Sequence, residues 1–174
     1  ADYQMAYSYI RTKNKVAAMN CFREASSMDY DAAIAEDAFF NWAKLAFDLN
    51  DDTSVFNAYI DAYPAKEQEQ RINSYIAVAA LHDRDYEAAV NAYDKIDELD
   101  DYMVLNYMKA NYLRANQLVK NGSYRLAIPC LKAAAYYSDR SSRFNQLARF
   151  WLAESYYRND QYKDALSVYN DLYN

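Results

Sequence analysis

The sequence predicts an all-α fold built from repeated helical hairpins, and three observations predict it. The chain of 174 residues contains one glycine and two prolines. Tight turns between strands and phosphate-binding loops both depend on glycine for positive φ, so a mostly β fold, a Rossmann site and a P-loop are excluded. Apolar residues recur at the i, i+3, i+4 spacing of amphipathic helices. A pair of small residues 12 positions apart recurs five times along the chain.

The small-residue pairs define five copies of one unit. They are Ala6 with Ala18, Ala43 with Val55, Ala77 with Ala89, Ala115 with Ala127, and Ala153 with Ala165. A larger residue follows each pair by four positions, namely Phe22, Tyr59, Tyr93, Leu131 and Tyr169. Small residues let two helices approach closely, and a larger side chain one turn later fills the space beside that contact. We therefore expect each copy to be a pair of packed helices.

This pattern resembles the tetratricopeptide repeat (TPR), a helix–turn–helix unit of about 34 residues. Successive copies start 37, 34, 38 and 38 residues apart. The segments between them are not rich in Gly, Pro or Ser, so the surplus of about one turn indicates longer helices. The sequence departs from the family where its leading Trp is expected, with Asp2, Phe39, Asn73, Asn111 and Arg149. The resemblance implies a right-handed α-solenoid of about five TPR-like repeats.

The expected helices follow from this register and from the turn residues. Polar segments at 83–85, 121–123 and 159–160 lie between the two halves of a copy and supply helix ends and caps. The single glycine, Gly122, is expected at such an end. We predict helices at 2–12, 15–27, 31–49, 53–62, 66–81, 86–98, 102–120, 124–137, 141–158 and 162–173. They form one domain over 1–174, which we expect to be part of a longer chain because it begins with Ala1 rather than Met.

Charge and hydropathy exclude two classes of partner. The chain carries 19 Lys and Arg against 25 Asp and Glu, a net charge of −6, and the basic residues are scattered. Nucleic-acid binding therefore lacks its main electrostatic contribution. No apolar run approaches the roughly 18 residues of a membrane helix, so membrane insertion is not expected.

The residues that most often carry chemistry have simpler structural explanations here. His82, the only histidine, is expected at a helix end beside Asp83 and Asp85, where the helix dipole stabilises it. Acidic clusters at 48–52 and 97–101 lack the spacing of a calcium loop and are expected to cap helices. A glycosidase-like pair of carboxylates would need longer loops than this chain has. We therefore predict no catalytic residue, no metal and no cofactor.

The two cysteines are expected to be buried free thiols. Cys21 and Cys130 fall in the second helices of the first and fourth copies. At roughly 8 to 10 Å for each packed helix layer, they would lie beyond the reach of a disulfide.

The TPR resemblance also implies a binding surface. In the family, the first helices of successive repeats line a concave groove that holds a peptide or a partner helix. The positions three before, one after and four after the first small residue are expected to face it. They are Tyr3, Tyr7, Ile10, Phe40, Lys44, Phe47, Ser74, Val78, Leu81, Tyr112, Asn116, Val119, Phe150, Glu154 and Tyr157. Tyr112 stands where the family's clamp for a terminal carboxylate has lysine, so that clamp is not expected in the groove.

The predicted function is that of a non-catalytic protein-interaction scaffold. Its expected partners include further copies of this chain, bound through the solenoid ends. The main contacts are expected from Tyr7, Phe40, Lys44, Phe47, Val78, Tyr112, Asn116, Phe150, Glu154 and Tyr157. The alternative is a helical protein that captures a glycan or nutrient at the cell surface, since exposed Tyr and Trp stack on sugars. Two or more coplanar exposed aromatic rings at one mouth would indicate the alternative.

A short segment suggests a location. Tyr59-Ile60 with Tyr63-Pro64, followed by Tyr86-Glu87-Ala88-Ala89, resembles TPR proteins of the bacterial envelope that act in outer-membrane assembly. The resemblance implies a periplasmic or cell-envelope protein, with the cytoplasm as the alternative.

Overall fold

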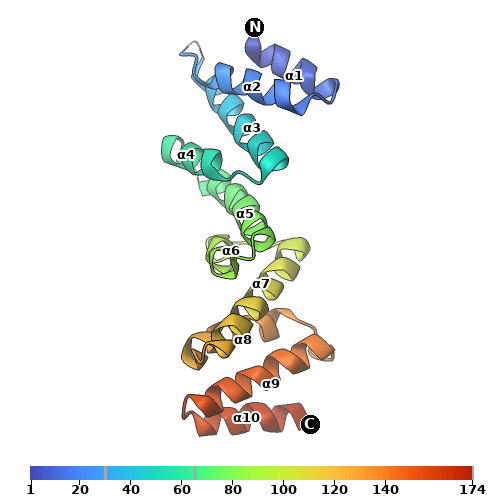
Figure 1. Cartoon of the computed structure of the whole chain (residues 1–174), viewed down its shortest axis with the longest axis vertical. Helices are drawn as coiled ribbons and strands as arrows, with labels where there is room; N and C mark the ends of the chain where they lie inside the picture. The colour runs from blue at the N-terminus through green and yellow to red at the C-terminus, as the bar shows by residue number, and fades with distance from the viewer. Residues whose placement is uncertain (30, 65, 174) are drawn as a thin grey trace. The chain divides into compact units, whose positions relative to one another are not determined.

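The computed structural model describes residues 1–29, 31–64 and 66–173, and these residues form ten α-helices and no strand (Figure 1). The helices are α1 Asp2–Arg11, α2 Lys15–Ser26, α3 Ala32–Asn50, α4 Ser54–Ala62, α5 Lys66–His82, α6 Tyr86–Tyr93, α7 Asp101–Lys120, α8 Tyr124–Tyr137, α9 Arg143–Arg158 and α10 Tyr162–Tyr173. They follow one another as about five helix pairs. The all-α class and the TPR-like pairing are therefore confirmed.

Burial confirms the predicted repeat register. Nine of the ten small residues are at most 2% exposed, and Val55 in the second copy is 9% exposed. The larger residue one turn later is buried in the first four copies and half-buried in the last, where it lies on the final described helix. Alanine at these positions lets the helix backbones approach, as the spacing predicts.

The chain divides into two compact units, and the first comprises Ala1–Ala79. In this unit, α1 packs on α2, α2 on α3, and α3 on α4. One core cluster contains Ala6, Ala18 and Phe22 with residues of α3. A second cluster joins α3, α4 and α5 around Phe56 and Tyr59. Aromatic side chains supply most of the large buried groups here.

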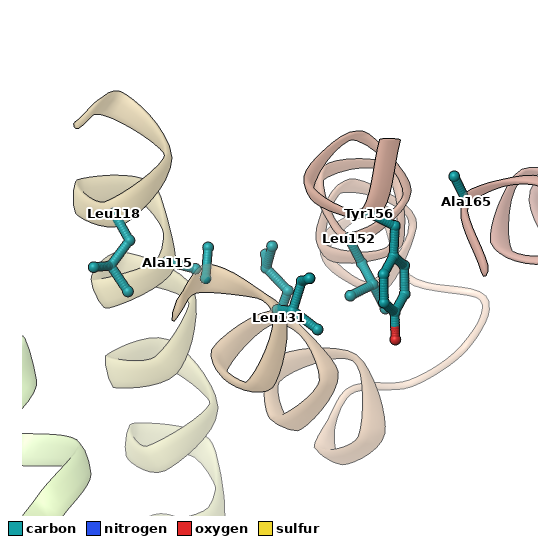
Figure 2. Packing of buried hydrophobic residues seen from close by; sticks show 8 residues of the cluster. Ala115, Leu118, Leu131, Leu152, Tyr156 and Ala165 are labelled. Carbon is teal, nitrogen blue, oxygen red and sulfur yellow. The ribbon is translucent and has the colours of Figure 1, made fainter. Parts of the chain in front are cut away.

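The second unit comprises Ala80–Asn174. In it, α6 packs on α7, and α7 to α10 pack each on the next. Figure 2 shows its main cluster, with Ala115 and Leu118 on α7, Leu131 on α8, and Leu152 on α9 lying along one core. The prediction of one domain over 1–174 remains a prediction.

One turn geometry joins the two helices in four of the five pairs. A residue seven positions after the first small residue has positive φ in each, and these residues are Lys13, Arg84, Gly122 and Asp160. The next N–H then donates to the carbonyl five residues earlier, as in Asn14 to Tyr9 at 2.9 Å and Gln161 to Tyr156 at 2.9 Å. This is the Schellman motif, which satisfies carbonyls at a helix end. The turn thus repeats with the same period as the packing residues.

The second pair has a different turn. Asp51 has φ 54° and its N–H bonds to the carbonyl of Phe47 at 2.8 Å. The helix that follows begins only at Ser54, and the Asp52 carboxylate accepts from the Ser54 N–H at 2.9 Å. A hydrogen bond from the Ser54 side chain lowers the pKa of Asp52, and the bond from the Ser54 N–H lowers it further.

One predicted helix is too long. The segment predicted as helix over 86–98 ends at Tyr93. Tight turns follow, in which the N–H of Ile96 donates to the carbonyl of Tyr93 at 3.0 Å. The Asp100 carboxylate then accepts from the Met103 N–H at 2.7 Å and begins α7. The acidic run 97–101 was correctly predicted to cap a helix, but the cap at Asp100 needs a non-helical chain before it.

We expect substitutions at the left-handed residues to change stability in opposite directions. Lys13→Gly should raise the free energy of unfolding by about 0.5 to 1 kcal/mol, because a side chain at positive φ costs more than the added freedom of glycine in the unfolded chain. Gly122→Ala should lower it by about as much, since a Cβ there meets no atom within 4 Å and only the backbone is strained. Urea titration monitored by circular dichroism measures both changes. Thr12→Gly, at φ −87°, is the control and should be destabilising.

We also expect the small residues to be essential for packing. Ala127→Leu should lower the free energy of unfolding by about 1 to 3 kcal/mol, because Ala127 is fully buried between packed helices and has no room for added methylenes. Arg125→Leu, on the exposed side of the same helix, should change it by no more than about 0.5 kcal/mol. Equal effects of the two variants in thermal unfolding would contradict the register.

Candidate functional site

A hollow of about 390 Å³ in the first unit brings predicted groove residues together. We call it the unit 1 hollow. Tyr7, Phe40 and Lys44, all predicted to face the groove, line it. Its other lining residues are Ala33, Glu36, Asp37, Asn41, Tyr59, Gln68 and Arg71. The side chains therefore come from α1, α3, α4 and α5.

Hydrogen bonds hold both carboxylates of the hollow in place. Asp37 accepts from the hydroxyls of Tyr3 at 2.7 Å and Tyr7 at 3.1 Å, and from the Asn41 amide at 2.9 Å. The bond to the Asp37 carboxylate is the main reason that the pKa of Tyr3 is raised. Such charge-assisted bonds fix the position of a carboxylate more firmly than neutral ones do.

The second carboxylate, Glu36, accepts from the hydroxyl of Tyr59 at 3.1 Å. Burial, and then this bond, raise the pKa of Tyr59 to about 12. Both Tyr3 and Tyr59 consequently stay protonated near neutral pH and act as hydrogen-bond donors.

An aromatic surface and two cations complete the unit 1 hollow. Phe40 is half-buried and packs against Phe56 and Tyr59 at ring distances of 6.2 Å and 5.5 Å. The Arg71 guanidinium carbon lies 5.0 Å from the centre of the Phe40 ring, within the range of a cation–π contact. Lys44 is exposed. The hollow thus offers an apolar ring, two cationic groups and two anchored carboxylates.

The structure does not bring every predicted residue of the first unit to this hollow. Phe47 is half-buried and packs on Phe56 and Tyr75 at 6.1 Å and 5.3 Å, so it belongs to the core cluster. Val78 is half-buried and does not line the hollow.

In the second unit the predicted residues lie in several environments. Phe150 is 43% exposed and lines a separate hollow of about 350 Å³ with Leu147 and Tyr169. Tyr157 is 53% exposed and contacts the ring of Tyr162 edge-on at 5.5 Å. These two aromatic side chains are accessible to a partner.

The other three predicted residues of this unit have internal contacts or less exposure. Glu154 accepts a hydrogen bond from the Tyr169 hydroxyl and pairs with Arg158 at 3.8 Å. Tyr112 packs on Phe144 with ring centres 4.9 Å apart, and Asn116 is half-buried.

Sequence reasoning missed both carboxylates and one of the two cations of the unit 1 hollow. Asp37 and Arg71 each lie six positions before the first small residue of their copy, Ala43 and Ala77. This is one turn before the positions that were used to predict the groove. Extending the predicted stripe by one turn toward the N-terminus would have found both residues and the neighbouring Glu36.

The residues set aside on sequence grounds lie mostly where they were expected. His82 ends α5, and Asp85 caps α6 by accepting from the Ala88 N–H at 3.0 Å. Within the described ranges, no three His, Cys, Asp or Glu side chains form a group that could hold a metal ion. None of the described helices is both long enough and apolar enough to cross a membrane.

The cysteines are less buried than predicted. Cys21 and Cys130 are free thiols and both are half-buried, because each lies beside its core cluster rather than inside it. Burial raises the pKa of the Cys130 thiol. This thiol is therefore mainly protonated at neutral pH.

Comparisons with known proteins add little to this description. No protein-family model matches the chain, and no curated protein matches it. One solved structure aligns with 98% of this chain and 91% of that chain. It contains nearly identical TPR-like repeats of a Podosopora anserina protein assigned as a kinesin light chain. The identity is 11% and the TM-score is 0.35. Because this likeness is weak, the TPR-like pairing rests on the helices, burial and turns of the chain itself.

We expect alkaline pH to destabilise the protein through its hydrogen-bonded and buried tyrosines. The pKa is raised for Tyr3, Tyr59, Tyr93, Tyr107 and Tyr169. A phenol whose pKa is higher in the folded state adds stability below its unfolded value of about 10, and this is lost as pH rises toward the folded value. The free energy of unfolding should therefore fall from about pH 10 upward.

Ultraviolet titration of phenolate measures this effect. In the native protein a subset of tyrosines should ionise later than the rest, and in guanidinium all should ionise together near their ordinary pKa. A single native transition near pH 10 would contradict the hydrogen-bond network around Asp37 and Glu36.

Proposed function

We propose that this chain is a non-catalytic protein-interaction scaffold, which binds a peptide or a partner helix on side chains of the first helix of each pair. The observation that carries the proposal is that Tyr7, Phe40 and Lys44, three of the residues predicted to face a groove, all line the unit 1 hollow. The accessible Phe150 and Tyr157 support an equivalent surface in the second unit. Val78, Phe47, Tyr112, Asn116 and Glu154 are proposed to support or border these surfaces.

The chemistry of the unit 1 hollow suits a peptide. An aromatic anchor with a few fixed polar groups is typical of sites that recognise a ligand by shape and hydrogen bonding. Lys44 and Arg71 can bind carbonyl or carboxylate oxygens, while the anchored Asp37 and Glu36 present fixed negative charge. The two anchored carboxylates need no rearrangement to meet a partner, so little of the binding free energy is lost on ordering them.

The glycan-binding alternative is less well supported. Stacking on a sugar needs exposed coplanar rings at one mouth. Ring pairs that line a common hollow are steeply inclined here, at 65° for Phe40 and Tyr59 and 66° for Phe150 and Tyr169. Aromatic groups are also distributed over both units. They are therefore not gathered at one mouth, as a compact sugar site would require.

A periplasmic or cell-envelope location is part of the proposal and rests on the short resemblance at 59–64 and 86–89. Fractionation of the native organism with an antibody to this chain tests it. Self-association through the ends of the repeat array also remains a prediction, and its measurement is sedimentation over a range of concentrations.

Variants at accessible residues test the proposed surface. A random peptide library displayed on phage and selected on the full chain supplies the probe, and titration of the selected peptide gives its affinity. Lys44→Ala should weaken a peptide bound in the unit 1 hollow, and Phe150→Ala one bound on the second unit. The expected loss is roughly 5- to 30-fold, which is about 1 to 2 kcal/mol.

Two exposed residues on second helices provide matched controls, Lys163→Ala on α10 and Leu126→Ala on α8. Neither should change the affinity, and circular dichroism should show unchanged helicity in all four variants. If only the second-helix variants lose binding, the proposed surface is wrong. Enrichment on a glycan array without any peptide enrichment would favour the alternative function.

A further inference from the structure

A second hollow lies in the second unit, between α8, α9 and α10, and has a volume of about 690 Å³. We call it the α8–α10 hollow. None of the side chains predicted to face the groove lines it. Its polar lining consists of Lys132, Tyr136, Ser138, Arg140, Asn145, Arg149 and Asp171. It is therefore a separate surface from the one proposed above.

Positive charge is concentrated here on an acidic protein. Arg149 and Arg140 both contact one carboxylate, that of Asp171, at 3.2 Å and 3.8 Å. Each guanidinium has five N–H donors, so a single shared carboxylate cannot use them all. Lys132 adds a third cation, which lies 5.6 Å from the ring of Tyr156. Three cations against one carboxylate line a single hollow, although the whole chain has a net charge of −6.

Asn145, which carries a buried acceptor, lines the same hollow. Asn145 is only 3% exposed, and its amide N–H groups donate to the Ala135 carbonyl at 2.7 Å and the Ser138 hydroxyl at 3.0 Å. These bonds hold the end of α8. Its Oδ1 atom accepts no hydrogen bond from any residue that the structure describes. A buried acceptor without a donor costs about 1 to 3 kcal/mol, so this oxygen favours a ligand that brings an N–H group.

We propose that the α8–α10 hollow binds an acidic segment of a peptide, with a carboxylate on Arg140 and Arg149 and a neighbouring N–H on the Asn145 oxygen. Guanidinium groups recognise carboxylates through paired hydrogen bonds, and a peptide supplies an N–H beside each acidic side chain. Leu152 and Val168 provide an apolar wall for the methylene groups of that side chain. One aromatic residue, Tyr136, lines this hollow, so stacking on a sugar ring between two aromatic faces is not available here.

Titration of the full chain with a defined peptide tests the proposal. The probe is a hexapeptide of alternating glutamate and alanine with both ends blocked, and the neutral probe replaces each glutamate with glutamine. Isotope-edited NMR should show shifts of the Asn145 side-chain amide with the acidic probe only. Arg140→Gln should weaken that probe about tenfold, as expected for a lost charge-assisted hydrogen bond. Arg140 is largely exposed, so this variant should fold normally.

Three further variants distinguish a specific site from general electrostatic attraction. Arg125→Gln also removes one positive charge, but from an exposed position on α8 outside the hollow. It should change the affinity for the acidic probe less than about twofold, because an exposed charge is screened. Asp171→Asn removes the internal competitor for both arginines and should tighten the acidic probe several-fold. Asp101→Asn, an equal charge change on α7, should leave it nearly unchanged.

Several results would overturn the proposal. They are equal binding of the two hexapeptides, equal losses in Arg140→Gln and Arg125→Gln, or no gain from Asp171→Asn. Absence of shifts at millimolar acidic probe would also overturn it. If N-acetylglutamate binds as tightly as the hexapeptide, the occupant is a small acid and the peptide assignment is wrong. Lys44→Ala should not affect this probe, so failure here leaves the proposed groove untouched.

Discussion

The burial of small residues on paired helices is the constraint on which the rest of the structure depends. Alanine at Ala115 and Ala127, for example, is fully buried, and the same is true of the first small residue in every copy. Because these positions contribute little volume, the space beside them is filled by one large side chain a turn later, such as Phe22 or Leu131. The Schellman turn occurs at a fixed distance from the same alanines in four copies. In these four copies, the buried small residues and the turn between the two helices therefore recur with the same spacing along the chain.

Because the closest positions are small, large aromatic residues beside them can both pack in the core and form hydrogen bonds. Tyr59 does both, since its ring is buried while its hydroxyl donates a hydrogen bond to Glu36. Tyr3 and Tyr7 likewise contact Phe22 with their rings and Asp37 with their hydroxyls. A phenol can do both because its polar group stands at the far end of an apolar body. The tyrosine-rich composition thus allows a packed helix surface to present fixed charge.

Charge on the molecule is organised locally rather than overall. Net negative charge argues against a polyanionic partner, and this holds for the chain as a whole. Within the α8–α10 hollow the local charge is positive, because Arg140 and Arg149 share one carboxylate, that of Asp171. Short-range contacts of this kind respond to the groups within a Debye length, about 8 Å at physiological salt, and not to the total. Composition alone therefore could not reveal such a surface.

The sequence by itself determined the all-α class, the helix pairing and the buried small residues, since a 12-residue spacing of small residues and a 3.6-residue period depend only on local geometry. Three of the residues that it predicted to face a groove, Tyr7, Phe40 and Lys44, line one hollow. Only the tertiary structure showed that α6 ends at Tyr93, where the Tyr107 hydroxyl of α7 donates to the carboxylate of the next residue, Asp94. The unit 1 hollow and the α8–α10 hollow likewise depend on three or more helices. The distances between side chains on different helices are set by packing that no single segment encodes.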